Sequence, residues 1–357
     1  MFDLAVVGLG PAGAQVARRA AEQGHEVVAL ERGRVGRPLA CSGHVSRDLW
    51  DFLPQGATDE LRHHEILGAR FHLDGVDRAY PFYREEPISN VIDRVGLDRR
   101  LAALAEAAGA EIRTERTVTG VEEDPEAVTL TAQGPAGEET VEARLVVGAD
   151  GPNSTVRREL GLPEPDEQLV GVLQHVPEAD HADFVDVHLT APTFFAWRIP
   201  RGEAGVEYGL AAPPAYDVTG HLDRWLRREN ATGGDRFGGH IPIGPPDRVH
   251  TDRAILVGDA AAQTKPFTGG GILYGLRAAE IAASTLDPRD PNTAAYERAW
   301  RAELGTEIRL GAWLRRAYSL PTPLARLGLR ALSGEIGVHM DEPSSLFSRE
   351  ALAALFR

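Results

Sequence analysis

The chain has 357 residues and a formal net charge of −15, with 43% hydrophobic and 25% charged residues, as expected of a globular protein of one or two domains. The acidic balance argues against a general nucleic-acid-binding protein. Cys41 is the only cysteine, which excludes an intrachain disulfide framework and a cysteine-ligated metal cluster. We also expect no bound metal. Because we see neither a signal peptide nor a run of ~20 apolar residues, we expect a cytoplasmic protein.

The basic residues are almost all arginine, and Lys265 is the only lysine. A GC-rich genome produces such a bias. Combined with the acidic surplus, it is also typical of a salt-loving organism, a halophile, and we favour this second explanation.

The first thirty residues predict one βαβ unit. Apolar strands are expected over 3–7 and 26–30, and a helix with apolar residues at helical spacing is expected over 12–23. The intervening turn, "GLGPAG", lies where a dinucleotide-binding fingerprint is found.

The residues of this turn each have a physical role in such a fingerprint. Gly8 permits the tight turn, Gly10 lets the backbone approach a pyrophosphate, and Gly13 lets the helix pack on the strand. Glu31 follows the second strand and is placed to accept a hydrogen bond from a ribose hydroxyl. The unpaired N–H groups at the helix N-terminus favour phosphate, so we predict nucleotide binding.

Two later segments repeat the strand–turn–helix pattern. "ARLVVGADGPNSTVRREL" places Asp150 at a strand end, and "RAILVGDAAAQTKPFTGGGILYGLRAAE" places Asp259 at another, ahead of a glycine triplet. Acidic residues at these positions can accept from sugar or ribityl hydroxyls, and Gly270 and Gly271 let backbone N–H groups approach a flat ring. Each segment alone is equally typical of an ordinary strand–turn–helix junction.

Taken in order, the three segments resemble the FAD motifs of the flavoprotein monooxygenase-like superfamily. Within it, residues 1–290 are most similar to the geranylgeranyl reductase family, which includes archaeal digeranylgeranylglycerophospholipid reductases. The resemblance implies an α/β fold in which a Rossmann-type FAD-binding domain is interleaved with an antiparallel-sheet substrate domain, followed by C-terminal helices. The expected divisions are 1–75, 94–165 and 248–290 for the FAD-binding domain, 76–93 and 166–247 for the substrate domain, and 291–357 for the helical region.

The resemblance also implies the residues that hold the cofactor. Arg94 would lie near the flavin, Val118 beside the adenine, and Asp259 at the ribityl chain. The full set is Gly8, Gly10, Ala12, Gly13, Glu31, Arg32, Cys41, Ser42, Gly43, Arg94, Val118, Asp150, Asp259, Gly270, Gly271 and Ile272.

Cys41 stands in "PLACSGHVS", where the reductase family has a cysteine and a nearby glycine close to the flavin. This chain departs from the family at His44, where many members have a small residue. A single cysteine is otherwise most often a small buried apolar residue. The resemblance implies a flavin-adjacent role, and a catalytic role as proton donor is the further hypothesis; it requires that the thiol stay protonated.

The stretch "TFFAWRIP" (193–200) predicts a half-buried strand with Phe195 and Trp197 on one face and Phe194 on the other. An aromatic-x-Trp-x-apolar-Pro motif occurs on such a strand in both geranylgeranyl reductases and flavin-dependent halogenases. Halogenases carry the halogenating species on a lysine early in the substrate tunnel, and no residue before Lys265 can fill that role. The substrate-lining residues expected for a prenyl chain are Phe195, Trp197, Ile199 and Pro200.

The function predicted from the resemblance is FAD-dependent reduction of carbon–carbon double bonds in geranylgeranyl chains of membrane lipids. The external reductant is left open among NAD(P)H, ferredoxin and deazaflavin. An FAD-dependent hydroxylase of a small aromatic or apolar substrate is the main alternative, ahead of a halogenase or a non-catalytic FAD-binding module. A quinone-reducing electron relay would need an iron–sulfur cluster, which one cysteine cannot ligate.

The segment 309–332, "RLGAWLRRAYSLPTPLARLGLRAL", mixes arginine with leucine, tryptophan and tyrosine. We expect an amphipathic helical hairpin broken at Pro321 and Pro323, with its apolar face on the core. Contact with a membrane surface is the alternative interpretation.

Overall fold

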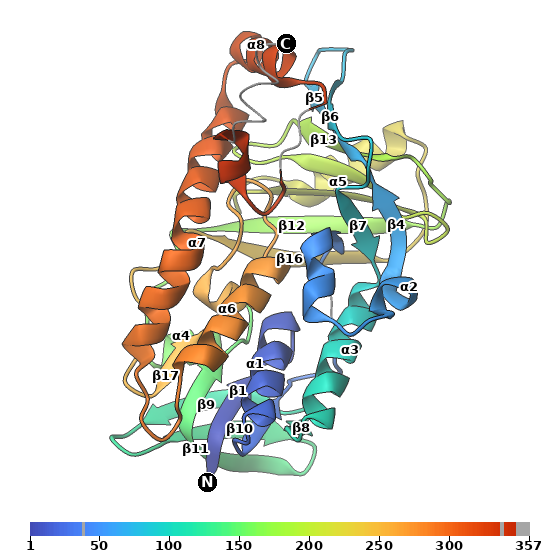
Figure 1. Ribbon diagram of the computed structural model, residues 1–357. Helices are drawn as coiled ribbons and strands as arrows, with labels where there is room; N and C mark the ends of the chain where they lie inside the picture. The colour runs from blue at the N-terminus through green and yellow to red at the C-terminus, as the bar shows by residue number, and fades with distance from the viewer. Residues whose placement is uncertain (38–39, 336–338, 348–357) are drawn as a thin grey trace.

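The computed structural model describes residues 1–37, 40–335 and 339–347, and its architecture is built around two seven-stranded sheets (Figure 1). The first sheet lies near the N-terminus, at the bottom of the view, and the second lies above it. The predicted α/β fold with C-terminal helices is confirmed.

The first sheet has a parallel centre and an antiparallel edge. Its strand order is β8-β2-β1-β11-β10-β9, with β17 also paired to β11. Strands β1, β2 and the end of β11 are buried along almost their whole length, as parallel strands covered on both faces must be. The strands are β1 (Phe2–Val7), β2 (Val27–Leu30), β8 (Glu111–Arg113), β9 (Thr117–Glu123), β10 (Val128–Gly134), β11 (Gly137–Gly148) and β17 (Ala254–Leu256).

Helix α1 (Pro11–Glu22) lies between α3 (Arg94–Ala107) and α6 (Ile272–Thr285) beside this sheet (Figure 1). Helix α1 connects the parallel neighbours β1 and β2, so the predicted βαβ unit is present. Because parallel strands end at a common edge, the residues that follow them collect there. The segments after β1, β2, β11 and β17 carry Gly8, Glu31, Asp150 and Asp259 in that order.

The second sheet has the order β16-β12-β15-β14-β13-β5-β6 and is antiparallel except where β13 pairs with β5. Strand β5 thus joins this sheet, although the predicted division placed residues 1–75 in the first domain. A third, three-stranded sheet has the order β3-β7-β4. The strands are β3 (His44–Ser46), β4 (Arg62–Ile66), β5 (Gly68–Leu73), β6 (Tyr80–Tyr83), β7 (Ser89–Ile92), β12 (Glu167–Val176), β13 (Phe184–Leu189), β14 (Ala196–Pro200), β15 (Val206–Ala212) and β16 (Arg236–Ile243).

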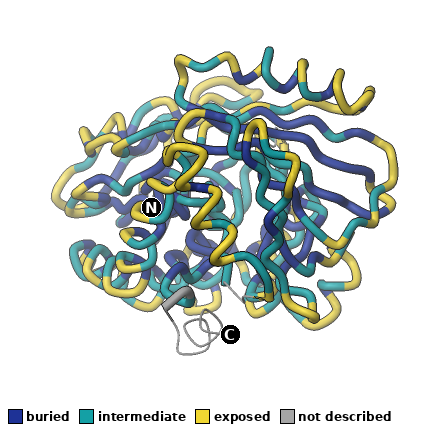
Figure 2. Tube along the Cα trace, turned by 90° about the horizontal axis from the view of Figure 1, so that it is seen from above, coloured by how far each residue is buried: buried dark blue, intermediate teal, exposed yellow. Residues whose placement is uncertain are grey.

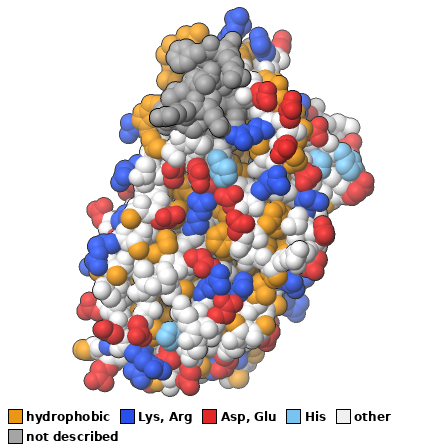
Figure 3. All heavy atoms as spheres, viewed as in Figure 1, with side chains coloured by type: hydrophobic (Ala, Val, Ile, Leu, Met, Phe, Trp, Pro, Cys, Tyr) orange, Lys and Arg blue, Asp and Glu red, His pale blue; other side chains and the backbone are white. Residues whose placement is uncertain are grey.

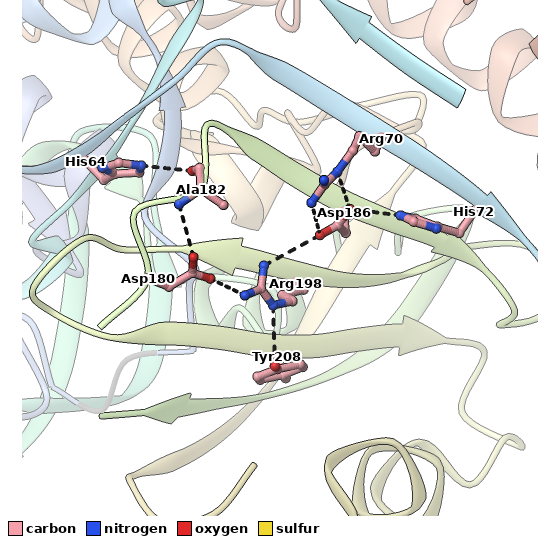
Figure 4. A network of polar contacts seen from close by, with 8 residues as sticks. All are labelled: His64, Arg70, His72, Asp180, Ala182, Asp186, Arg198 and Tyr208. Atoms are coloured by element: carbon pink, nitrogen blue, oxygen red, sulfur yellow. Dashed lines mark hydrogen bonds and ion pairs between the residues drawn. The ribbon is translucent and has the colours of Figure 1, made fainter. Parts of the chain in front are cut away.

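The outer face of the second sheet packs on α5 (Val218–Arg228) and carries a polar network (Figure 4). Asp186 on β13 accepts two hydrogen bonds of 2.8 Å from Arg70 on β5 and one of 2.8 Å from His72. Arg198 on β14 pairs with Asp180 and Asp186 and donates to the Tyr208 hydroxyl at 3.4 Å. Hydrogen bonds and ion pairs thus connect neighbouring strands on this face. Arg198 points away from the face that carries Trp197.

The remaining helices are short or C-terminal. The short ones are η1 (Arg47–Phe52), α2 (Ala57–Leu61), α4 (Thr155–Glu159), η2 (Gly258–Ala261), η3 (Arg316–Ser319) and η4 (Pro343–Phe347). Helix α7 (Thr293–Arg315) runs alongside both sheets, and α8 (Thr322–Leu332) packs on β5 and β6 at the top of Figure 1. Seen from above, the strands and inner helices are mostly buried and the peripheral loops mostly exposed (Figure 2).

The expectation that the apolar face of 309–332 packs on the core is wrong for α8. Ala325 is the one buried residue of this helix, at 8% exposed, and it packs with Leu73 and Tyr80. Leu324 and Leu327 are 56% and 67% exposed, because α8 packs on this cluster through Ala325 and Leu329 instead. None of the helices in the described ranges is both long and apolar enough to span a bilayer.

Candidate functional site

The glycine turn between β1 and α1 brings helix and strand into unusually close contact. A Cβ on Gly13 would lie 2.0 Å from the carbonyl oxygen of Gly8, a distance that no side chain tolerates. A Cβ on Gly10, by contrast, would have no heavy atom within 4 Å. Gly10 is the N-cap of α1, whose first turn leaves N–H groups unpaired. The turn therefore offers both space and donors to a phosphate group.

Glu31 is fixed against this turn by the backbone. Its Oε2 accepts from the Leu9 N–H at 2.9 Å, and its Oε1 accepts from the Gly33 N–H at 3.0 Å. Each carboxylate oxygen keeps a lone pair for a further donor. The carboxylate thus has the capacity to accept from ribose hydroxyls, whereas the adjacent Arg32 is exposed.

Asp259, in η2, lies against the glycine triplet. A Cβ on Gly271 would meet its Oδ1 at 2.5 Å, and Ile272 begins α6 immediately afterwards. Desolvation raises the pKa of Asp259 to about 6, partly offset by the nearby charge of Arg94. No hydrogen-bond donor in the described part of the chain reaches this carboxylate, so it is available to a ligand hydroxyl.

Arg94 lies between the segment Cys41–Gly43, which we call the cysteine loop, and Asp259. It is 7% exposed and forms a double hydrogen bond with Asp98, at 2.6 and 3.1 Å. Burial by itself would lower the pKa of Arg94. The neighbouring Asp98 and Cys41 raise it by more, so the pKa of Arg94 lies above its usual value. A Cβ on Gly43 would lie 3.0 Å from the Arg94 side chain. The structure therefore brings Cys41, Gly43, Arg94 and Asp259 together from distant parts of the sequence.

Two of the predicted cofactor residues also have structural roles. The Asp150 carboxylate accepts from Ser154 Oγ at 2.6 Å and from the Thr155 and Val156 N–H groups at 2.7 and 3.1 Å, so it satisfies the first N–H groups of α4. Asp150 nonetheless lies beside Gly8, whose Cβ position is 2.9 Å from the Asp150 Cα. Val118 is 6% exposed and belongs to the core of the first sheet.

The aromatic segment differs from the predicted strand at its start. Strand β14 begins at Ala196, because Thr193 has a left-handed φ of 57° and turns the chain. The Phe194 and Phe195 rings consequently stack on each other at 4.3 Å and both contact Tyr318. The expectation that they point to opposite faces is wrong.

From Ala196 onward the predicted alternation holds. Trp197 and Ile199 share the inner face of the second sheet, and Phe195 contacts the Trp197 ring edge-on at 5.9 Å. This face is turned toward the first sheet: a Cβ on Gly239 would lie 3.0 Å from Ala40, and a Cβ on Gly269 would lie 3.1 Å from Phe194. Pro200 ends the strand and is buried.

Sequence reasoning missed three residues on or beside this face. Gly209 pairs with Trp197 across the strands, and its Cβ would meet the indole at 2.5 Å, so the ring lies flat on β15. Glu207 accepts from the indole N–H at 2.7 Å, and Arg201 donates to the Ser42 carbonyl at 2.7 Å. The available signal was an acidic residue in an otherwise apolar strand, "VEYGLAA".

Comparison with known proteins identifies the family. The FAD binding domain family matches residues 1–218. The digeranylgeranylglycerophospholipid reductase of Methanothrix thermoacetophila is 30% identical over 86% of this chain and 84% of its own length. The second such reductase of Methanothermobacter thermautotrophicus is 29% identical over 86% of this chain and 85% of its own length. The chain belongs to the digeranylgeranylglycerophospholipid reductase family.

Solved structures agree with this family on the fold. A geranylgeranyl bacteriochlorophyll reductase-like protein from Thermoplasma acidophilum superposes with a TM-score of 0.87 at 22% identity, covering 99% of this chain and 95% of that one. A flavin-dependent halogenase superposes with a TM-score of 0.74 at 19% identity, covering 99% and 76%. The fold is thus shared with flavoenzymes of other activities.

The cofactor of this family member is FAD, and the residues present fit it. The edge where the parallel strands end carries in turn the open space at Gly10, the anchored Glu31 carboxylate and the Asp259 carboxylate, which has no hydrogen-bond partner among the described residues. They offer partners for a pyrophosphate, a ribose and a polyol chain respectively.

A matched pair of substitutions separates phosphate binding from folding. Gly10→Ala adds a methyl group in open space, so we expect an unchanged melting temperature for the cofactor-free protein but a severe loss of FAD binding. Gly13→Ala forces a clash with the Gly8 carbonyl and should lower the melting temperature itself. Thermal unfolding and FAD titration check both, and normal FAD affinity in Gly10→Ala would contradict the assignment.

The raised pKa of Asp259 predicts a pH effect on stability. A carboxyl that binds its proton more tightly when folded contributes stability that is full at low pH and is lost as the pH rises through about 6. Asp259→Asn should therefore become more stable relative to the wild type as the pH rises from about 4 to about 6, measured by thermal unfolding of cofactor-free protein. Asp124→Asn, at an exposed site whose carboxyl has a lowered pKa, is the control and should show no such gain. Parallel pH profiles for wild type and Asp259→Asn would contradict the prediction.

Proposed function

We propose that this protein is an FAD-dependent reductase that saturates carbon–carbon double bonds in the geranylgeranyl chains of an archaeal-type membrane lipid. The observation that carries the proposal is similarity over 86% of the chain to reductases named for such a lipid. The halogenase neighbour, at 19% identity, supports the fold alone.

The chain's own residues would first hold the cofactor. The turn at Gly8, Gly10 and Gly13, with Ala12 in the first turn of α1, would bind the pyrophosphate, and Glu31 the ribose. Asp259 and the backbone at Gly270 and Gly271 would hold the polyol chain and the ring edge. FAD, when bound and reduced by an external donor, supplies the hydride for the reduction.

The second sheet would supply the substrate wall. A prenyl chain offers only apolar surface, so its binding depends on buried apolar area rather than on hydrogen bonds. Phe195, Trp197 and Ile199 provide such surface on one face, adjoining the glycine triplet through Phe194, and the buried Pro200 would close the end of this strand. These side chains would also exclude water from the reacting atoms.

Cys41 is the candidate proton donor at its Sγ. It is partly exposed and lies beside Arg94. The charge of Arg94 also lowers the pKa of Asp259, partly offsetting the effect of burial. Protonation of one alkene carbon completes the saturation begun at the other. Water is the alternative proton source, and Cys41→Ser separates the two by its effect on turnover.

The proposal predicts a yellow protein whose dithionite-reduced form adds two hydrogen atoms per double bond to a geranylgeranyl lipid, as detected by mass spectrometry. Trp197→Ala should lose about tenfold or more in turnover, because the apolar wall is removed, while retaining FAD. An oxygenated aromatic product formed in air with NADPH would favour a hydroxylase instead. Loss of FAD from Trp197→Ala would return this strand to a purely structural role.

We further propose that α8 and the end of α7 contact the membrane that holds the lipid. Among the described residues there are six exposed large hydrophobic side chains, and five of them lie in α8, at the end of α7 or between the two: Trp313, Leu320, Leu324, Leu327 and Leu332. Figure 3 shows hydrophobic side chains gathered over these helices at the upper left edge. The segment 309–332 also has five arginines and no acidic residue, in a chain of net charge −15. Apolar and cationic groups on one helical segment fit an anionic lipid surface.

Vesicle sedimentation tests this contact. The protein should bind phosphatidylglycerol vesicles more tightly than phosphatidylcholine vesicles, and Leu327→Glu should weaken binding by about tenfold, because one leucine no longer enters the bilayer. Arg224→Glu on α5 is the control for an added negative charge on a different helix. Equal binding by wild type and Leu327→Glu would contradict the proposal.

A further inference from the structure

The inner face of the second sheet contains one carboxylate, Glu207, that is fully buried at 0% exposed. It occurs in β15, where every residue is buried. Removing a carboxylate from water without partners is costly, so its neighbours must satisfy both oxygens. Those neighbours come from β12 and from β14 with the residue that directly follows it.

The two oxygens of Glu207 serve different partners. Oε1 accepts from the Trp197 indole N–H at 2.7 Å. Oε2 accepts from His175 Nε2 at 2.9 Å and lies 3.5 Å from Arg201 Nη1. One carboxylate thus links strands β12, β14 and β15 on the face that carries the proposed substrate wall.

Arg201 extends the link to the cysteine loop. It is 6% exposed, and the same Nη1 that faces Glu207 donates to the Ser42 carbonyl at 2.7 Å. Ser42 directly follows Cys41. The loop is held on its other side by the contact of Gly43 with Arg94.

We propose that Glu207 is a positioning residue that orients Trp197 directly and the Cys41–Gly43 loop through Arg201. The indole has little freedom, since its ring lies flat on Gly209 and its N–H is bound by Glu207. The loop carbonyl is bound by an arginine that faces the same carboxylate. The substrate wall and the thiol therefore share one buried anchor, and the role in turnover rests on the proposed function.

The sheet provides a matched control. Asp186 is also a buried carboxylate, 6% exposed, and it too is bound by arginine and histidine, here Arg70, Arg198 and His72 (Figure 4). It lies on the opposite face and contacts neither Trp197 nor the cysteine loop. Asp186→Asn and Glu207→Gln hence remove comparable buried charges, of which only one has the proposed role.

The test uses Cys41 as a reporter, since it is the only thiol in the chain. In the FAD-bound protein, Glu207→Gln should increase the rate of iodoacetamide labelling at Cys41 at least several-fold, because the loop loses its anchor. Asp186→Asn should label at the wild-type rate even if its melting temperature falls. Labelling needs no lipid substrate, so its outcome is independent of the proposed reaction.

Kinetics supply the second measurement. With geranylgeranyl lipid, Glu207→Gln should lower kcat by about tenfold with little change in KM, since misplacement of reacting groups affects the chemical step more than binding. If Glu207→Gln does not fold, Arg201→Gln removes the links to Ser42 and Glu207, leaves the Trp197–Glu207 hydrogen bond in place, and should also increase labelling. Wild-type labelling in a folded Glu207→Gln or Arg201→Gln protein, or an equal increase in Asp186→Asn, would overturn the proposal.

Discussion

The close contact among the smallest residues of the chain is the constraint on which the site depends. Ala12 in α1 lies against Gly258 and Gly275, with contact distances of 3.0 and 3.2 Å to the positions of their missing Cβ atoms. Gly13 and Gly8 meet still more closely. Because nothing larger than a methyl group separates these backbones, the first helix, η2 and α6 converge at one point. The carboxylates of Glu31 and Asp259 are thereby carried to the same edge of the first sheet.

This packing explains why the first sheet and its nucleotide-binding turns could be predicted from the sequence, whereas the second sheet was predicted less well. The glycine positions, the apolar strands and the acidic strand ends all have local causes that a sequence displays. The alternation of Trp197 and Ile199 was predictable for the same reason. The stacking of Phe194 on Phe195 was not, because it follows from the left-handed backbone of Thr193.

Glu207 and α8 could not be predicted for a different physical reason. A buried carboxylate is stable only with partners, and those of Glu207 come from residues 175, 197 and 201 through strand pairing that a local pattern does not specify. Conversely, the apolar spacing of α8 predicts burial, but in the structure only Ala325 and, in part, Leu329 pack on the cluster at β5 and β6. Amphipathic periodicity indicates that a helix has an apolar face, but it does not specify what covers that face.

The burial of Lys265 has a consequence for the chemistry of the surface. Its ammonium, 4% exposed, is paired with Asp341, and the chain has no other lysine. Every other basic side chain is a guanidinium or an imidazole, which bind carboxylates and phosphates through planar, directional donors. Reagents that acylate lysine side chains would therefore find almost none to modify on the folded protein, whereas dicarbonyl reagents directed at arginine would find many. For surface chemistry, this is a protein without lysine.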